Sequence, residues 1–164
     1  MFSAGEIIDL AIQIERNGEK VYRDALQKIS NHPLSSLLEW LADQEAEHAT
    51  WFSNLKLAIT EAPVDTDLEE MGKTMLQRVL GDQTFSLTDV DFSKIDQIEG
   101  LIKLAIEFER DTVLFYEMIE SFIDDEQTMD HLKKIIHEEE RHAQVLEELL
   151  ESGAVKRGQS NSAQ

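Results

Sequence analysis

Hydrophobic residues recur at alternating steps of three and four positions in four long segments of the chain, a spacing typical of amphipathic α-helices. The pattern predicts helices over about residues 4–30, 34–61, 95–123 and 127–152. Ser3 and Glu6 have the spacing of a capping box at the first helix start. Gly153 follows the last helix at the position of a left-handed C-terminal cap. We therefore expect an all-α protein.

The connections between these predicted helices differ in length. Short polar links join the first helix to the second and the third to the fourth, whereas a polar stretch over about residues 64–93 separates the two pairs. Within it, residues 68–80 have the composition of a shorter helix ended by Gly81. This arrangement predicts two antiparallel hairpins joined by a long crossover, in one four-helix bundle over residues 1–153. Residues 154–164 are small, polar and aperiodic, which predicts a disordered tail.

The two predicted hairpins share one sequence template, because seven residues of the first recur 94 positions later in the second. The repeated residues are Ala11, Glu15, Arg16, Tyr22, Glu45, His48 and Ala49, which return as Ala105, Glu109, Arg110, Tyr116, Glu139, His142 and Ala143. A single Glu-x-x-His is weak evidence in a Glu-rich chain. Two such motifs in the same register, each with the same upstream Glu and Tyr, indicate a shared functional site.

Four glutamates of this template fall inside the apolar stripes, namely Glu15, Glu45, Glu109 and Glu139. An unpaired carboxylate there would cost several kcal/mol, so a compensating charge is expected. The i, i+3 spacing places His48 and His142 each beside the Glu of its own motif, on the helix face that points to the bundle axis. Two divalent cations would neutralise four carboxylates, which predicts a dinuclear metal site.

The chemistry of these side chains narrows the choice of metal. Carboxylates with one imidazole per metal suit iron or manganese better than calcium, which prefers oxygen alone. Structural zinc sites are rich in Cys or His, and the chain has no Cys. Iron is therefore the expected metal.

Composition adds constraints on partners and location. The chain has 34 acidic and 15 basic residues and a formal net charge of -19, which repels nucleic-acid phosphates and anionic lipid headgroups. No segment approaches the roughly 20 apolar residues of a transmembrane helix. Glu6 and Asp9 stand where a secretory signal would be basic and then apolar. We expect a cytoplasmic protein that binds neither nucleic acid nor membrane.

At the residues of the repeat, the sequence resembles the ferritin-like di-iron carboxylate proteins, and the rubrerythrin family in particular. The segments AIQIERNGEKVY and AIEFERDTVLFY are similar to the first and third helices of that family, and ADQEAEHA and HEEERHA to the second and fourth. The resemblance covers about residues 4–152. It implies a ferritin-like four-helix bundle that binds two iron ions, with manganese or zinc as substitutes.

The resemblance also implies roles for individual residues. The metal ligands it implies are Glu15, Glu45, His48, Glu109, Glu139 and His142. Tyr22 and Tyr116 are implied as hydrogen-bond partners of the ligand carboxylates. Glu138 lies one turn before His142 and competes with Glu139 for the ligand position, but its counterpart in the first hairpin is Gln44. We therefore expect Glu138 to lie outside the ligand set.

The activity implied by the resemblance is that of a di-iron oxidoreductase that reacts with hydrogen peroxide or O2, in oxidative stress or iron metabolism, as a homodimer or larger homo-oligomer. Two features differ from the family pattern. Full-length rubrerythrins hold a further iron on four Cys of a rubredoxin domain, and this chain has none, so electrons would come from an external donor such as a rubredoxin-like protein. Peroxidase members carry an additional Glu where this chain has Thr112.

Two other functions remain open from the sequence. One is a ferroxidase or iron-handling protein that oxidises Fe(II) for storage or detoxification, since the acidic surface would attract cations. The other is a metal-free helical interaction module, in which the Glu and His residues form a solvated polar seam.

Overall fold

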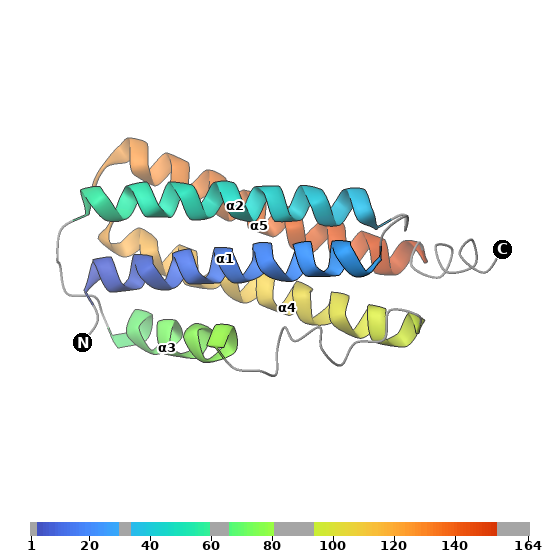
Figure 1. Ribbon diagram of the computed structural model, residues 1–164. Helices are drawn as coiled ribbons and strands as arrows, with labels where there is room; N and C mark the ends of the chain where they lie inside the picture. Colours follow the sequence, from blue (N-terminus) through green and yellow to red (C-terminus); the bar gives the residue numbers. More distant parts are fainter. Residues whose placement is uncertain (1–2, 30–33, 60–65, 81–93, 154–164) are drawn as a thin grey trace.

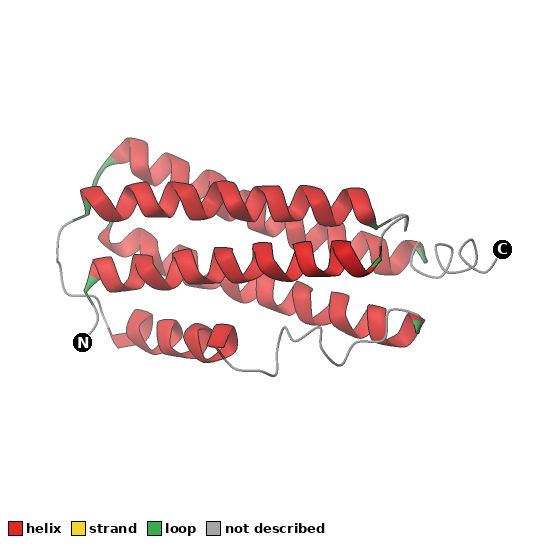
Figure 2. Cartoon of the chain, viewed as in Figure 1, coloured by secondary structure: helices red, strands yellow, loops and turns green. Residues whose placement is uncertain are grey.

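The computed structural model describes residues 3–29, 34–59, 66–80 and 94–153. The described part of the chain contains five α-helices and one short 3-10 helix: α1 (Ala4–Lys28), α2 (Ser35–Ala58), α3 (Thr66–Leu80), α4 (Ile95–Ile119), η1 (Glu120–Phe122) and α5 (Glu126–Ser152). Four long helices lie along a common direction, with α3 against the outside of the bundle (Figures 1 and 2). The predicted all-α four-helix bundle is confirmed.

The order of the helices in space is that of two hairpins. Helices α1 and α2 run antiparallel beside each other, and so do α4 and α5 (Figure 1). Helix α4 also runs opposite to α1, so α2 ends and α4 begins at opposite ends of the bundle (Figure 1). A connection between the hairpins must therefore cross the length of the bundle, which agrees with the long crossover predicted from the sequence.

The helix ends follow local capping chemistry. The capping box at the start of α1 is confirmed: the Glu6 N–H donates to Ser3 Oγ at 3.3 Å, and the Ser3 N–H donates to Glu6 Oε2 at 2.8 Å. Gly153 ends α5 at φ 67°, a left-handed conformation that favours glycine. Helix α2 ends at Ala58 because Ile59 is extended. The predicted tail over residues 154–164 lies outside the described residues.

The third long helix is shorter than predicted. It was expected to reach about residue 123, but α4 ends at Ile119 and continues only as the 3-10 turn η1, after which Ile123 is extended. The chain must turn here to reach Asp125, whose carboxylate accepts the Thr128 N–H at 2.7 Å and caps α5. A tightened last turn followed by a new N-cap is a change of direction that apolar periodicity does not report.

Helix α3 extends the predicted short helix of residues 68–80 by two residues at its start. Its buried side chains include Leu68 and Met75, and it packs mainly on α1 and α4. Gly72 permits this approach, because a Cβ there would lie 2.9 Å from Leu10 Cδ1. Among the described helices, none combines the length and apolar character that crossing a membrane requires.

The apolar core is divided into two clusters by a polar layer. Along α1, one cluster ends at Ile14 and the other begins at Tyr22, with Glu15 between them. Along α5, the same two clusters contain Ile136 and Leu146. The repeated Glu and His residues occupy this middle layer in all four long helices, enclosed by apolar side chains at both ends.

Candidate metal centre

Each of the four long helices contributes to the polar layer. Helices α1 and α4 supply one Glu each, and α2 and α5 supply the two Glu-x-x-His pairs. The six side chains are Glu15, Glu45, His48, Glu109, Glu139 and His142, each no more than 3 % exposed. They come from positions of the apolar stripes, so the packing that buries each helix face also carries these groups to the bundle axis.

The six side chains form two overlapping groups of four. In the first, one ligand atom from each residue lies within 4.8 Å of the others, and the same holds in the second. The first group is Glu15, Glu45, His48 and Glu139, and the second is Glu45, Glu109, Glu139 and His142. Glu45 and Glu139 belong to both groups. Each group therefore has one Glu and one His of its own and shares two carboxylates with the other.

Two tyrosines hold the unshared carboxylates from across the bundle. Tyr22 Oη on α1 donates to Glu109 Oε1 on α4 at 2.5 Å, and Tyr116 Oη on α4 donates to Glu15 on α1. Burial, together with the adjoining Glu109 or Glu15 carboxylate, raises the pKa of each tyrosine well above its usual value. Both hydroxyls therefore stay protonated as donors. The structure thus places Tyr22 and Tyr116 against carboxylates, and each tyrosine serves the opposite hairpin.

The imidazoles hold protons in the metal-free cluster. Burial disfavours the charged form of His48, but the carboxylates of Glu139 and Glu15 favour it more strongly and raise the pKa of His48 to about 12. His142 behaves alike, since neighbouring carboxylates led by Glu109 outweigh burial and raise its pKa far above the ordinary value. Positive charge in this layer is therefore favoured even without a metal.

The pKa values of the carboxylates shift in two directions: those of Glu45 and Glu109 are raised, and that of Glu139 is lowered. Burial and the neighbouring charges of Glu139 and Glu109 raise the pKa of Glu45 well above its usual value. Burial and Glu139 raise the pKa of Glu109 to about 7. Burial acts to raise the pKa of Glu139 too, but its contacts with His142 and His48 outweigh that effect and lower this pKa. The cluster therefore contains more negative charge than its two imidazolium groups can compensate when all four carboxylates ionise.

Several inner atoms of the cluster have no hydrogen-bond partner among the described residues, although they are buried. These atoms are Glu15 Oε2, Glu45 Oε1, His48 Nδ1, both Glu139 oxygens and His142 Nδ1; the other ring nitrogen of His142, Nε2, likewise has no partner. His48 Nδ1 lies 2.6 Å from Glu139 Oε1, and His142 Nδ1 lies 3.1 Å from Glu45 Oε1, without the geometry of a hydrogen bond. Buried polar atoms are normally satisfied, so lone pairs that converge in this way fit two metal cations.

Glu138 lies outside both groups of four, as expected. Its Oε2 is 2.9 Å from His48 Nε2, the ring nitrogen on the side away from the cluster. Thr112 is buried, and its Oγ1 donates to the Phe108 carbonyl of its own helix at 2.8 Å. The Thr112 hydroxyl is thus used by the backbone and is not offered to the carboxylates.

Gly18 is a site residue that the sequence analysis did not identify. A Cβ at Gly18 would lie 3.1 Å from Glu45 Cδ and still closer to Glu45 Oε2, so the missing side chain provides the space that this carboxylate occupies. Gly18 is the repeat counterpart of Thr112, 94 positions earlier. The available signal was a glycine in the interior of a buried helix face, where it lowers helix stability and needs a packing reason.

Substitution Gly18→Ala is expected to weaken metal binding by about 10- to 100-fold, because the new methyl group displaces the shared Glu45 carboxylate. Competition with a chelator would measure this affinity. Gly100→Ala on α4 is the matched control, since a Cβ there has no neighbour within 4 Å among the described residues. Equal affinities in the two variants would show that the space at Gly18 does not position Glu45.

The chain is similar to a known protein family. The family model described as Rubrerythrin matches residues 6–150. No match is found among curated proteins or among solved structures. The matched range covers the four long helices apart from the first two residues of α1 and the last two of α5, and it includes all six residues of the two overlapping groups. The chain therefore belongs to the rubrerythrin family.

Proposed function

We propose that the protein is a non-haem di-iron oxidoreductase that reduces hydrogen peroxide or O2 with electrons from an external donor. The observation that carries the proposal is the pair of overlapping four-residue groups that share Glu45 and Glu139 in the buried centre of the bundle. Two iron ions there would supply two electrons, which with two protons convert one hydrogen peroxide to two water molecules.

The residues have distinct roles in this proposal. Glu15 and His48 would hold one metal ion and Glu109 and His142 the other, and the carboxylates of Glu45 and Glu139 would be available to both ions. The hydrogen bonds from the tyrosines keep Glu15 and Glu109 oriented. The apolar clusters on either side limit the entry of water, which strengthens the electrostatic interactions inside.

The donor set supports iron, with manganese or zinc as substitutes. Each position offers carboxylate oxygens and one imidazole, a mixture that suits iron or manganese better than calcium. The chain has no Cys to hold a second iron centre, so we propose that electrons come from a separate protein of the rubredoxin type. The oxidant is a small molecule, since the site is buried.

A second candidate is a ferroxidase, for which Fe(II) is the substrate. Two observations favour it: the net charge of -19, and a cleft of about 290 Å³ beside His48 whose lining includes Glu47 and Glu138. Acidic groups near an opening attract cations to it. The two functions separate in one assay, because a ferroxidase accumulates ferric product beyond the resident pair while an oxidoreductase turns over with a reductant and releases no iron.

Rapid mixing of the anaerobically Fe(II)-loaded protein with hydrogen peroxide and, separately, with O2 tests the proposal. We expect measurable oxidation by both. In peroxidase relatives an additional Glu at position 112 implies exchange of a carboxylate for a His ligand, and Thr112 cannot supply this carboxylate. Thr112→Glu is therefore expected to raise the ratio of the peroxide rate to the O2 rate by about tenfold or more.

Thr112→Gln is the matched control, because it has the size of Glu without the charge, and its rate ratio should stay near that of the unmodified protein. An unmodified protein that already prefers peroxide by orders of magnitude would contradict the argument from Thr112. An Fe(II)-loaded protein that reacts with neither oxidant would contradict the proposed function itself.

A further inference from the structure

The two histidines of the site are equivalent in the sequence repeat but differ in their surroundings. Both direct Nδ1 at the carboxylates of the cluster. His48 Nε2 lies 2.9 Å from Glu138 Oε2 on α5. His142 Nε2 has no hydrogen-bond partner among the described residues, and the ring of Trp40 packs edge-on against His142 at 5.3 Å between centroids. One imidazole contacts a carboxylate through Nε2, and the other has an indole packed against its ring.

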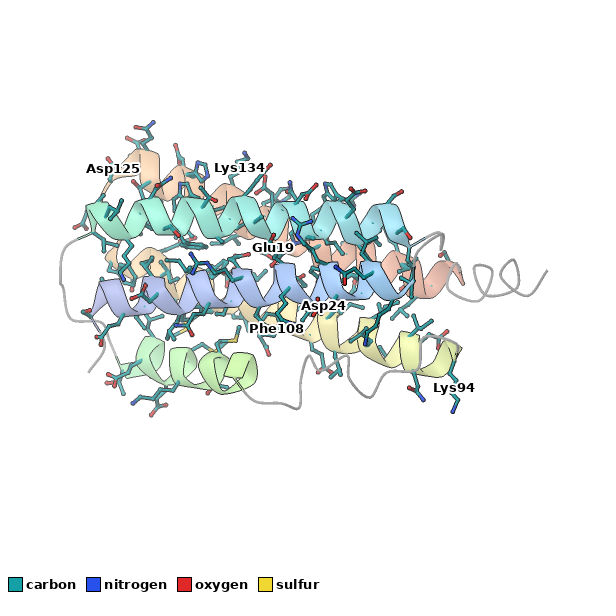
Figure 3. The ribbon with its side chains drawn as sticks, in the orientation of Figure 1. Glu19, Asp24, Lys94, Phe108, Asp125 and Lys134 are labelled. Atoms are coloured by element: carbon teal, nitrogen blue, oxygen red, sulfur yellow. The ribbon has the colours of Figure 1, made fainter. Side chains whose placement is uncertain are left out.

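The sequence encodes this difference at two pairs of repeat positions. Glu138 on α5 corresponds to Gln44 on α2, so the second hairpin has a carboxylate where the first has an amide. Trp40 on α2 corresponds to Lys134 on α5. Lys134 Nζ is 3.7 Å from Glu138 Oε1, and the side chain of Lys134 points away from the bundle (Figure 3). The two hairpins therefore have identical residues at the six positions of the cluster but different residues at these two positions around it.

The hydrogen bond to Glu138 determines how His48 is presented. An imidazole that binds a metal through Nδ1 keeps its proton on Nε2, and a carboxylate acceptor at Nε2 fixes both this tautomer and the ring orientation. Such a carboxylate also makes the imidazole a stronger ligand. His48 has this acceptor in Glu138, whereas the apolar contact of His142 with Trp40 supplies none.

We propose that Glu138 is a positioning residue which makes the metal position of Glu15 and His48 the tighter of the two, so that it fills first. The inference rests on the proposed dinuclear function and adds an order of loading to it. Access supports the same order, because His48 and Glu138 both line the cleft of about 290 Å³ whereas His142 is fully buried. A dinuclear site with unequal positions has a resident metal and a second metal that exchanges more readily.

Titration of the metal-free protein with Zn(II) alone tests the order of loading, with nitrogen-15 NMR of the imidazoles and calorimetry as readouts. We expect the His48 ring signals to shift during the first equivalent and the His142 signals during the second. We also expect a hydrogen-bonded Nε2 proton on His48 that exchanges slowly with water. A merely structural role for Glu138 would leave the order in which the two histidine signals shift unchanged in Glu138 variants.

The variants E138A and E140A separate the hydrogen bond from the loss of one negative charge on α5. Glu140 lies two residues away, its side chain is 56 % exposed, and it faces His137 rather than the cluster. E138A is expected to weaken the first binding step by about 10- to 100-fold and to lose the His48 proton signal, while E140A leaves both unchanged. E138Q keeps an oxygen acceptor and should therefore lose less affinity than E138A. If E138A fails to fold, the comparison of E138Q with the unmodified protein still tests the hydrogen bond.

Three results would overturn the proposal: simultaneous shifts of both histidines, His142 shifting before His48, or equal first-step affinities in E138A and E140A. If two Zn(II) ions still bind in those cases, the dinuclear function stands and only the role of Glu138 fails. If the unmodified protein binds no metal, the proposed function fails, and the order of loading fails with it.

Discussion

Replacement of Glu139 by Ala is expected to abolish binding of both metal ions, with a loss of overall affinity well above about 100-fold. Glu139 is fully buried and belongs to both groups of four, so its removal takes a ligand from each position. Substitutions of groups that merely support a ligand already cost about 10- to 100-fold, and loss of a shared ligand must cost more. Metal content after loading and the change in thermal midpoint would measure the effect.

Glu45→Ala should show the same loss, because Glu45 is the second shared carboxylate and the repeat counterpart of Glu139. Glu140 lies on the exposed side of α5, the helix of Glu139, and Glu140→Ala should leave both metals bound. Glu138→Ala should weaken only one of the two binding steps. Equal losses in the Glu138 and Glu139 variants would show that the wrong glutamate of α5 has been assigned to the cluster.

Metal affinity is expected to rise steeply with pH. The pKa of His48 is raised to about 12 and that of His142 is raised far above its ordinary value, so both imidazoles carry an additional proton between pH 6 and 8 in the metal-free protein. A metal must displace these protons before it can bind Nδ1. Release of these two protons alone makes the overall constant for two metals change by about 100-fold per pH unit, and a proton held by Glu45, whose pKa is also raised, would add to this change.

The direction follows from mass action: lower pH supplies the protons that compete with the metal, so affinity falls as pH falls. The slope should steepen below pH 7, because Glu109, with a pKa of about 7, then retains a proton as well. Calorimetry in two buffers of different ionisation enthalpy counts the protons released. An affinity independent of pH, with no proton release, would show that the metal-free cluster is not protonated as described.

The features predicted from the sequence are those that depend on local periodicity. Burial of one face of each long helix determines the 3.6-residue pattern. Gly153 predicted a C-terminal cap because glycine favours the left-handed conformation that it adopts in the structure. The internal repeat pointed to Glu15 and Glu109, because two identical spacings impose matching positions on the two hairpins. The structure brings these groups to one layer.

Other features could not be read from spacing because they depend on contacts between hairpins. The hydrogen bonds of Tyr22 and Tyr116 run crosswise between α1 and α4, and a pattern within one hairpin does not show which carboxylate each tyrosine reaches. The contact of His48 with Glu138 joins α2 to α5. The role of Gly18 depends on the rotamer of Glu45 on a neighbouring helix. These contacts between helices depend on how the helices pack and on side-chain rotamers, which the spacing of residues in the sequence does not reveal.

The number of iron ions bound per chain tests the dinuclear centre most directly. The metal-free protein would be loaded with Fe(II) without oxygen, freed of unbound metal and analysed for iron and for its thermal midpoint. We expect about two iron ions per chain and a clear rise in the thermal midpoint, because a metal that binds only the native state stabilises it. A reproducible stoichiometry near zero, with no change in the midpoint, would contradict it.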